Sequence, residues 1–283
     1  DYDIATNAKP EDVIRIFHKV IPTGIAHGTV TILFMGQSIE ATTYRIEKDY
    51  TDGRHPDKVE YASKIEEDLS RRDFTMNAIA ASLADGSIVD PFGGQIDIQQ
   101  KTIRTVGNPL ERFSEDGLRP VRALRFAAQL GFEIEPETLK AIPVTNHITK
   151  GISIERFRDE FVKMLKSPKP SVALNLMEKT GIMEMFLPEL FECRNVIQRD
   201  IRGFHSFDVL DHLIYALDGV ILASKNQASV ELRLASLFHD IGKPAAKKIE
   251  KRPYFKDGKE TIENFNTFHG HEYPSAKIAK DVL

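Results

Sequence analysis

Two carboxylates lie close together at the start of the chain. Asp1 and Asp3 are separated by one residue, and in a β-strand this spacing places both side chains on one face. Paired carboxylate oxygens are what a hard Mg²⁺ ion needs if it is also to hold nucleotide phosphates. Glu40 is the best-placed third carboxylate, because its segment has a strand pattern and could pair alongside the first strand. The alternatives are solvated turn residues for the pair and a solvent-facing strand residue for Glu40.

A second group of chemically capable residues is Arg71-Arg72-Asp73, with Asn77 four residues later. A carboxylate accepts the proton of a hydroxyl group, so Asp73 can distinguish ribose from deoxyribose. The alternative is an exposed Arg–Asp pair.

The third group is Glu115-Asp116, with Arg119 three residues after the aspartate. On a helix, Asp116 and Arg119 would face the same way. One is an acceptor and the other a donor fork, so a rigid pair can bind the Watson–Crick edges of both C and A. Arg122 and Arg125 continue this face, with surface ion pairs as their alternative role. Pro120 indicates that the helix begins near Leu118.

The fourth group lies near the C-terminus, where His239 and Asp240 follow an apolar run. His212 precedes them, and His269 and His271 come later. Imidazole nitrogen and carboxylate oxygen together can bind a transition metal and activate a water molecule. These residues resemble the HD phosphohydrolase domain, and the resemblance implies a transition-metal site with the ligands His212, His239, Asp240 and His271. The alternative is a scaffold whose site stays empty.

Local patterns predict the elements that position these residues. Apolar alternation and turn residues predict strands and turns at 28–35, 35–37, 38–44 and 88–94, with a polar loop at 49–57. Helical spacing predicts helices from Lys9, at 65–81, 118–130, 138–142, 154–165 and 172–180, and in a region from Phe207. A mixed sheet with helices thus precedes a helical remainder.

The ordered motifs Asp1-Tyr2-Asp3, Arg71-Arg72-Asp73 and Glu115-Asp116-x-x-Arg119 resemble the bacterial tRNA nucleotidyltransferase (CCA-adding) and poly(A) polymerase family. This is the class II branch of the polymerase-β superfamily. His212 and His239-Asp240 resemble the HD phosphohydrolase domain. The resemblance implies an α+β fold, with a small mixed-sheet polymerase-β-like nucleotidyltransferase head followed by an all-helical neck and body and an HD-like helical domain. The corresponding ranges are 1–106, 107–197 and 198–283.

The resemblance also implies a function and its residue roles. The protein would add C and A to the 3′ end of tRNA from CTP and ATP, without a nucleic-acid template. Asp73 would meet the 2′-hydroxyl, and Arg71 and Arg72 the phosphates. Asp116 and Arg119 would replace the template, oriented by Glu115, while Arg122 and Arg125 approach the triphosphate. The family's glycine-rich turn before the first aspartates and the last aspartate of the HD pattern are not in this chain, so we expect a fragment of a longer protein.

Composition narrows the classes. The 283 residues include 41% hydrophobic and 28% charged residues, with a formal net charge of −4. This charge argues against non-specific coating of nucleic acid, though not against a local basic cleft. No apolar run is long enough to span a membrane. The single cysteine, Cys193, excludes an internal disulfide and favours a cytoplasmic protein with a buried, unreactive thiol.

Three other functions remain open at this point. A poly(A) polymerase, or an enzyme adding only CC or only A, would share every motif. An HD phosphohydrolase could use the head merely to bind nucleotide. A non-catalytic RNA-binding fragment is the third.

Overall fold

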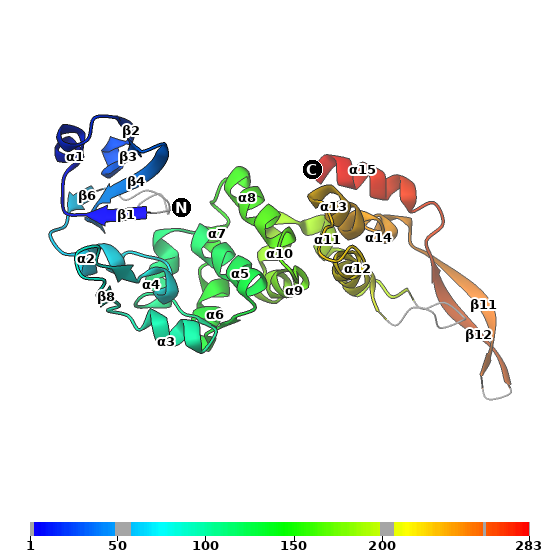
Figure 1. The fold of residues 1–283 in the computed structure, drawn as a ribbon. Helices are drawn as coiled ribbons and strands as arrows, with labels where there is room; N and C mark the ends of the chain where they lie inside the picture. Colours follow the sequence, from blue (N-terminus) through cyan, green and yellow to red (C-terminus); the bar gives the residue numbers. More distant parts are fainter. Residues whose placement is uncertain (1–2, 49–57, 199–206, 257–258, 283) are drawn as a thin grey trace. The chain divides into compact units, whose positions relative to one another are not determined.

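The computed structural model describes residues 3–48, 58–198, 207–256 and 259–282 (Figure 1). The chain forms two compact units. The first contains residues 1–120 and 133–152, and the second contains residues 121–132 and 153–283.

A four-stranded mixed sheet forms the centre of the head. Its strands are β1 (Asp3–Thr6), β2 (Val20–Gly24), β3 (Thr29–Phe34) and β4 (Gln37–Thr43), in the order β1-β4-β3-β2. β1 runs parallel to β4, whereas β3 is antiparallel to both β4 and β2. The predicted mixed sheet is therefore confirmed.

The hairpin between β3 and β4 is closed by two residues. Phe34 pairs with Gln37, and the intervening Met35 and Gly36 have φ angles of 49° and 77°. Two positive φ angles in a two-residue connection define the turn that matches the twist of the strands. The predicted hairpin is confirmed, and it fixes the register that places Glu40.

One face of the sheet is covered by α1 (Pro10–Ile16). Val13 of α1 packs with Val30, Ile32 and Ala41 in a buried cluster. Pro10 is at the first helical turn, with Glu11 and Asp12 beside the positive helix end, as the sequence predicts. Because side chains alternate along a strand, the residues that directly precede or follow the cluster's members in sequence point to the other face of the sheet.

The rest of the first unit consists of short elements. The strands are β5 (Arg45–Lys48), β6 (Lys58–Tyr61), β7 (Ala80–Ala81), β8 (Ile88–Val89), β9 (Thr102–Ile103) and β10 (Glu133–Ile134). The helices are α2 (Ile65–Ser70), α3 (Gly94–Gln99), α4 (Pro109–Glu115), α6 (Pro136–Val144) and α7 (Asn146–Thr149). The predicted loop at 49–57 lies outside the described residues.

The predicted helix at 65–81 is wrong after its first turns. α2 ends at Ser70, and Thr75–Asn77 form a separate 3-10 turn. The segment instead pairs with a distant one: Phe74 bridges Thr105, and the Val106 N–H donates to the Asp73 carbonyl at 3.1 Å. This long-range pairing overrides the helical spacing and leaves Asp73 in a bend outside any helix, next to the bridged Phe74.

The second unit is mostly helical. Its helices are the greater part of α5 (Leu118–Leu130), α8 (Ile154–Leu165), α9 (Ser171–Thr180), α10 (Ile182–Phe186), α11 (Pro188–Phe191), α12 (Val209–Ala223), α13 (Val230–Phe238), α14 (Lys243–Ala246) and α15 (Glu272–Val282). α5 starts and ends as predicted. Among the described residues, no helix has both the length and the apolar character needed to cross a membrane.

A long hairpin interrupts this helical region. β11 (Lys248–Lys256) and β12 (Lys259–Thr267) pair in antiparallel register, seen as the orange ribbon in Figure 1. The sequence did not predict these strands, because their many lysines and glutamates obscure the apolar alternation. Phe265 on β12 is only 7% exposed, and its ring centroid lies 6.0 Å from that of Tyr254 on β11. This pair is an apolar contact between the two strands.

Candidate functional site

The carboxylates of the head lie on the open face of the sheet. Asp3 and Glu40 are directly opposite each other in the parallel pair β1–β4, and both are exposed. Val30 and Ala41 on the neighbouring positions are buried against α1, so Asp3 and Glu40 face the opposite side. The prediction that the Glu40 strand pairs beside the first is confirmed. Asp1 lies outside the described residues.

A buried aspartate holds the two arginines of the ribose motif. Asp68 Oδ1 accepts hydrogen bonds from Arg71 Nε at 3.0 Å and Nη2 at 2.8 Å, and Asp68 Oδ2 accepts one from Arg72 Nη2 at 3.2 Å. The Asp68 side chain is 2% exposed. Sequence reasoning missed Asp68, although its spacing of three and four residues before the arginines on a helix was a usable signal.

Asp73 is held in a single orientation. Its Oδ1 accepts hydrogen bonds from the Phe74 N–H at 2.8 Å and from Asn77 Nδ2 at 2.9 Å. The residue is 9% exposed. Asn77 therefore does belong with Asp73, as the motif predicts, and its contact is with the carboxylate itself.

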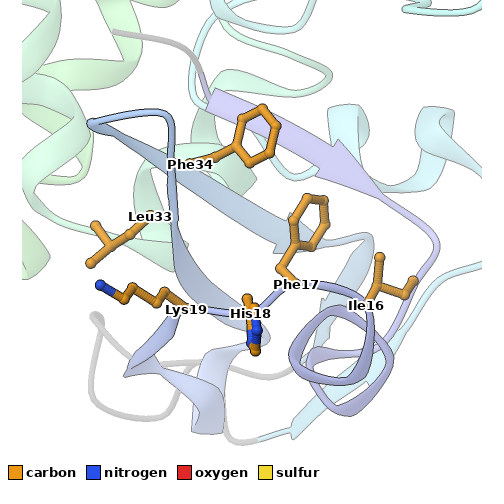
Figure 2. Close-up of a pocket in the computed structure, with 6 residues that line it drawn as sticks. All are labelled: Ile16, Phe17, His18, Lys19, Leu33 and Phe34. Carbon is orange, nitrogen blue, oxygen red and sulfur yellow. The ribbon is translucent and has the colours of Figure 1, made fainter.

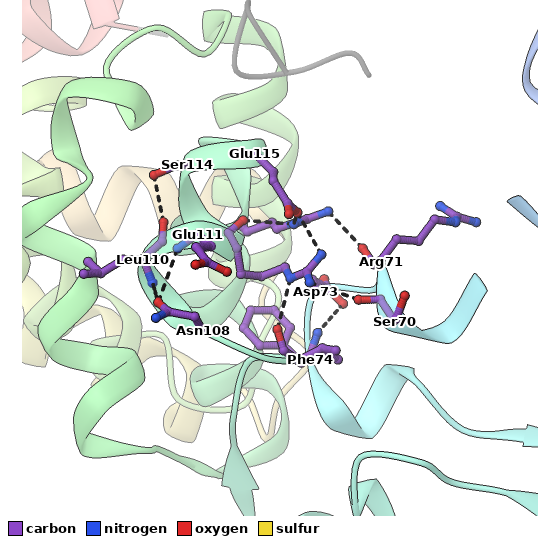
Figure 3. Close-up of polar contacts among 12 residues, drawn as sticks. Ser70, Arg71, Asp73, Phe74, Asn108, Leu110, Glu111, Ser114 and Glu115 are labelled. Atoms are coloured by element: carbon purple, nitrogen blue, oxygen red, sulfur yellow. Dashed lines mark hydrogen bonds and ion pairs between the residues drawn. The ribbon is translucent and has the colours of Figure 1, made fainter. Parts of the chain in front are cut away.

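Arg119 is bound by three groups of the first unit, and two of the residues that supply them, Glu115 and Arg71, are labelled in Figure 3. Its Nη1 donates to Glu115 Oε2 and to the Arg112 carbonyl at 2.9 Å, and its Nη2 donates to the Arg71 carbonyl at 3.1 Å. Glu115 Oε2 also accepts a hydrogen bond from Arg112 Nη1 at 2.8 Å. The expected role of Glu115 in orienting Arg119 agrees with this geometry, whereas Arg112 was not predicted.

Asp116 does not share a helix with Arg119, so the predicted same-face spacing is wrong. α4 ends at Glu115, Asp116 is extended with φ −143° and ψ 111°, and α5 begins at Leu118. Asp116 Oδ1 accepts a hydrogen bond from the Leu118 N–H at 3.0 Å. The aspartate thus caps α5, because first-turn N–H groups have no partner within their helix.

Gly117, between these residues, leaves no room for a side chain. An added Cβ would lie 2.8 Å from the Ile148 carbonyl oxygen and 3.0 Å from Thr149 Cα. Contacts this short with backbone atoms would displace the turn. Glycine is therefore required by close packing here, and this requirement keeps Asp116 and Arg119 in place.

Arg122 and Arg125 lie on the part of α5 that belongs to the second unit. Arg125 pairs with Glu160 at 2.5 Å, and the two side chains are 10% and 3% exposed. Both guanidinium groups lie over the Phe126 ring, at 5.4 Å for Arg122 and 3.7 Å for Arg125. A buried ion pair accounts for the position of Arg125, and contact with a triphosphate remains a prediction for both residues.

Histidines and an aspartate converge in the second unit. His212 Nε2 on α12 lies 3.1 Å from His239 Nε2 at the end of α13. Both nitrogen atoms are near Asp240 Oδ2, at 3.2 Å and 3.3 Å. His271 Nε2 lies 2.9 Å from Asp240 Oδ1, whereas His269 is exposed. The structure thus brings together all four predicted ligands, and it favours His271 over His269.

Asp240 is the carboxylate on which the contacts of this cluster converge. Burial by itself would raise the pKa of Asp240, but hydrogen bonds from His212, His239 and Lys243 hold that pKa well below its usual value. Lys243 Nζ lies 2.6 Å from Asp240 Oδ2. The hydrogen bond to Asp240 raises the pKa of His239. His239 Nδ1 faces the Ser236 carbonyl at 2.8 Å, an arrangement that orients the ring and directs Nε2 toward the cluster.

Cys193 and a surface pocket are separate features. Burial raises the pKa of the Cys193 thiol to about 12, which agrees with the predicted unreactive cysteine. A cavity of about 730 Å³ in the head is lined by Ile16, Phe17, His18, Lys19, Leu33 and Phe34 (Figure 2). Its lining contains no carboxylate and none of the predicted site residues.

Three family descriptions match successive parts of the chain. Residues 1–104 match the "Poly A polymerase head domain", and residues 131–193 match the "Probable RNA and SrmB-binding site of polymerase A". Residues 204–283 match the "HD domain".

Curated relatives share much of this sequence. A CCA-adding enzyme of Geobacillus sp. (strain WCH70) is 47% identical over 202 residues, which cover 71% of this chain and 50% of the relative. The CCA-adding enzyme of Bacillus subtilis (strain 168) is 44% identical over 218 residues, covering 77% and 54%. The chain therefore spans about half the length of the curated relatives it matches.

Solved structures give the same result. The CCA-adding enzyme of Bacillus stearothermophilus, crystallised with CTP, matches with a TM-score of 0.61 and 34% identity, covering 83% of this chain and 65% of that one. A tRNA nucleotidyltransferase complexed with a primer tRNA and an ATP analogue matches with a TM-score of 0.59 and 27% identity, covering 84% and 66%. The chain belongs to the tRNA nucleotidyltransferase and poly(A) polymerase family, and its C-terminal part is an HD domain.

Proposed function

We propose that the protein is a tRNA nucleotidyltransferase that adds C and A to the 3′ end of tRNA from CTP and ATP. The observation that carries this proposal is the fixed position of Arg119, which is bound to Glu115 and to the backbone of the ribose motif. A donor fork held this way can take the place of a template base. The relatives named as CCA-adding enzymes support the proposal.

The transfer step uses a divalent metal ion, and the residues of the head fit Mg²⁺. Asp3 and Glu40 offer only oxygen atoms, from adjacent exposed positions of paired strands. Asp1 is the third predicted ligand. The metal would lower the pKa of the attacking 3′-hydroxyl and neutralise charge on the leaving pyrophosphate. The carboxylates would bind the ion and orient it toward the nucleotide phosphates.

The remaining residues would bind the nucleotide. Asp73 would accept a hydrogen bond from the 2′-hydroxyl while Asn77 Nδ2 donates to Asp73 Oδ1. Arg71 and Arg72 would bind phosphates. Arg119 and Asp116 would bind the base edge. Arg122 and Arg125 would approach the triphosphate, which requires Arg125 to loosen its pair with Glu160.

The intact protein, incubated with tRNA lacking its terminal CCA and with single nucleotides, tests this proposal. Sequenced 3′ ends reading CCA support it. Ends reading CC, A or a long A tract would instead assign a partial enzyme or a poly(A) polymerase. An unchanged tRNA in every reaction would leave RNA binding as the activity of the head.

Sugar selection gives a narrower prediction. Replacing Asp73 by Ala should reduce the preference for ATP over dATP by about one to two powers of ten, because a hydrogen bond to a charged acceptor contributes about 1.5–3 kcal/mol. The loss should come mainly from slower use of ATP. Steady-state kinetics with both nucleotides measures this ratio, and Asp97→Ala, which removes another buried aspartate of the head, is the control. An equal ratio in the Asp73 variant and the parent would assign ribose recognition elsewhere.

A second candidate function concerns the HD domain. His212, His239 and Asp240 present ligand atoms that all lie within 4.8 Å of one another, and His271 adds a further nitrogen. Two or three imidazole nitrogens with one carboxylate suit Ni²⁺, Mn²⁺, Co²⁺ or Fe²⁺ better than Mg²⁺. Such a metal would activate water for hydrolysis of 2′,3′-cyclic phosphates, with Asp240 first released from Lys243.

The HD proposal predicts a loss of bound metal. His271→Ala should weaken the metal affinity of the intact protein by about 10- to 100-fold or more, so that elemental analysis finds less bound metal than in the parent, and cyclic-phosphate hydrolysis should fall in parallel. His269→Ala is the matched control, because His269 is exposed and two residues away. Nucleotide addition should persist in both variants. An intact protein with neither metal nor hydrolysis would make this domain a helical scaffold.

Two broader statements also remain proposals. We infer a head at 1–106, a neck and RNA-binding region at 107–197 and the HD domain at 198–283, which the matched family ranges support without fixing these limits. A cytoplasmic location follows from the proposed tRNA substrate and from the single cysteine.

A further inference from the structure

Arg112, on α4 of the first unit, belongs to none of the predicted motifs. Its side chain is 14% exposed, and its guanidinium binds three separate segments. Nε donates to the Val106 carbonyl at 3.1 Å, Nη1 to Glu115 Oε2 at 2.8 Å and Nη2 to the Ser70 carbonyl at 3.0 Å. A planar fork can satisfy three fixed acceptors at once, which an ordinary surface ion pair does not require.

The contacts of Arg112 join those of Arg119. Glu115 Oε2 accepts from both guanidinium groups, and the Arg112 carbonyl accepts from Arg119 Nη1 at 2.9 Å. Arg112 binds the Ser70 carbonyl while Arg119 binds the next carbonyl, that of Arg71. Figure 3 shows Ser70 and Arg71, whose carbonyls accept these bonds, close to Asp73 and Glu115.

The residue proposed to bind the base and the residue proposed to bind the ribose are therefore positioned by the same set of contacts, those of Arg112, Glu115 and the Ser70–Arg71 backbone. Arg119 is the donor fork proposed for the base, and Asp73 is the acceptor proposed for the ribose, two residues beyond Arg71. If Glu115 lost one of its two arginines, its carboxylate could turn together with Arg119. Selection against an incorrect base requires that its polar groups stay without hydrogen-bond partners. A guanidinium that can turn would donate to incorrect bases as well, so this selection would weaken.

We propose that Arg112 is a positioning residue for nucleotide selection, which holds Glu115 and the Ser70–Arg71 backbone so that Arg119 and Asp73 keep a fixed separation. This inference rests on the proposed nucleotidyltransferase function. Arg112 acts through Arg119 and Glu115, not on the nucleotide itself. Removing its fork should therefore change selectivity more than the rate with the correct nucleotide.

The test is Arg112→Lys in the intact protein. Lysine keeps the positive charge, but a single ammonium nitrogen cannot reach three acceptors in different directions. On tRNA lacking its terminal CCA, we expect the preference in kcat/KM for CTP and ATP over UTP and GTP to fall by about tenfold. Adding Glu115→Gln to this variant should lower selectivity little beyond the effect of Glu115→Gln alone, because both changes loosen the same set of contacts.

Arg194→Lys is the matched control. Arg194 is 22% exposed and joins Glu178, Asp208 and Asp211 within the second unit, so its lysine variant also breaks a multiple arginine contact. It should lower Tm without altering selectivity. If Arg112→Lys likewise lowers Tm and leaves selectivity unchanged, Arg112 is only structural and this inference is overturned while the proposed function stands. If the parent protein adds no nucleotide, the proposed function fails and the inference fails with it.

Discussion

Asparagine in place of Asp3 is expected to lower incorporation of CMP and AMP into tRNA by more than about a hundredfold. The substitution keeps the size of the side chain but removes the charge that a divalent metal needs, and residues that merely orient a metal ligand already contribute about 10- to 100-fold. Asp3 lies on the exposed face of the sheet, opposite Glu40. Single-turnover extension of tRNA lacking CCA measures the rate.

Asp12→Asn is the control for this experiment. Asp12 is a partly exposed carboxylate of the same unit that pairs with Arg15 on α1. It should extend tRNA at the parent rate, and both variants should still bind tRNA in a filter or shift assay. Near-normal incorporation by the Asp3 variant would remove this residue from metal binding, and Glu40→Gln would then show whether the other carboxylate of the pair carries the metal.

Base selection is expected to weaken by about one to two powers of ten when Arg119 is replaced by lysine. The rigid guanidinium of Arg119 leaves polar groups of a wrong base without a partner, and each such group in a closed pocket costs about 1–3 kcal/mol. The flexible ammonium of lysine would not impose this cost. The measurement is the ratio of kcat/KM for CTP and ATP to that for UTP and GTP. Arg158→Lys, at an exposed ion pair, should leave this ratio unchanged.

Asp116 needs a different substitution, because its carboxylate also caps α5. Asp116→Ala would confuse loss of the base contact with loss of the cap, which contributes about 0.5–2 kcal/mol to stability. Asparagine is as good a cap as aspartate but presents an amide to the base. Asp116→Asn should therefore keep Tm and lose selectivity. Full selectivity in both the Asp116 and Arg119 variants would contradict the proposed template role of this pair.

The sequence predicted best where local rules were sufficient. The turn at Met35 and Gly36, the start of α1 at Pro10 and the span of α5 all follow from short patterns. In each case the residues with special backbone preferences, glycine or proline, agree with the hydrophobic spacing beside them. Agreement among local preferences is what allows a short segment to specify its own conformation.

The sequence was misleading in two ways: in one place a distant segment competed with local preference, and in another a hairpin of neighbouring strands lacks apolar alternation. The helical pattern at 65–81 loses to the pairing of Phe74 with Thr105, and the hairpin of β11 and β12 forms despite a polar pattern. Hydrogen bonds between segments far apart in sequence are invisible to periodicity. The same reason explains why Arg112 was missed, since its bond to the Ser70 carbonyl joins segments far apart in sequence. Asp68 was missed although its spacing from Arg71 and Arg72 was a local signal.

The sequence by itself determined which chemical groups the protein has and in which order: the Asp-x-Asp start, the Arg-Arg-Asp motif, the Glu-Asp-x-x-Arg motif and the His-Asp pair. Only the tertiary structure decided how these groups are held. It set Glu40 opposite Asp3 through strand register, and it moved Asp116 off the helix of Arg119 and made it a cap. It also tied Arg119 to the Arg71 carbonyl across 48 positions of sequence. The reason is that residue type fixes what a side chain can donate or accept, whereas orientation depends on long-range contacts that exist only once the chain has folded.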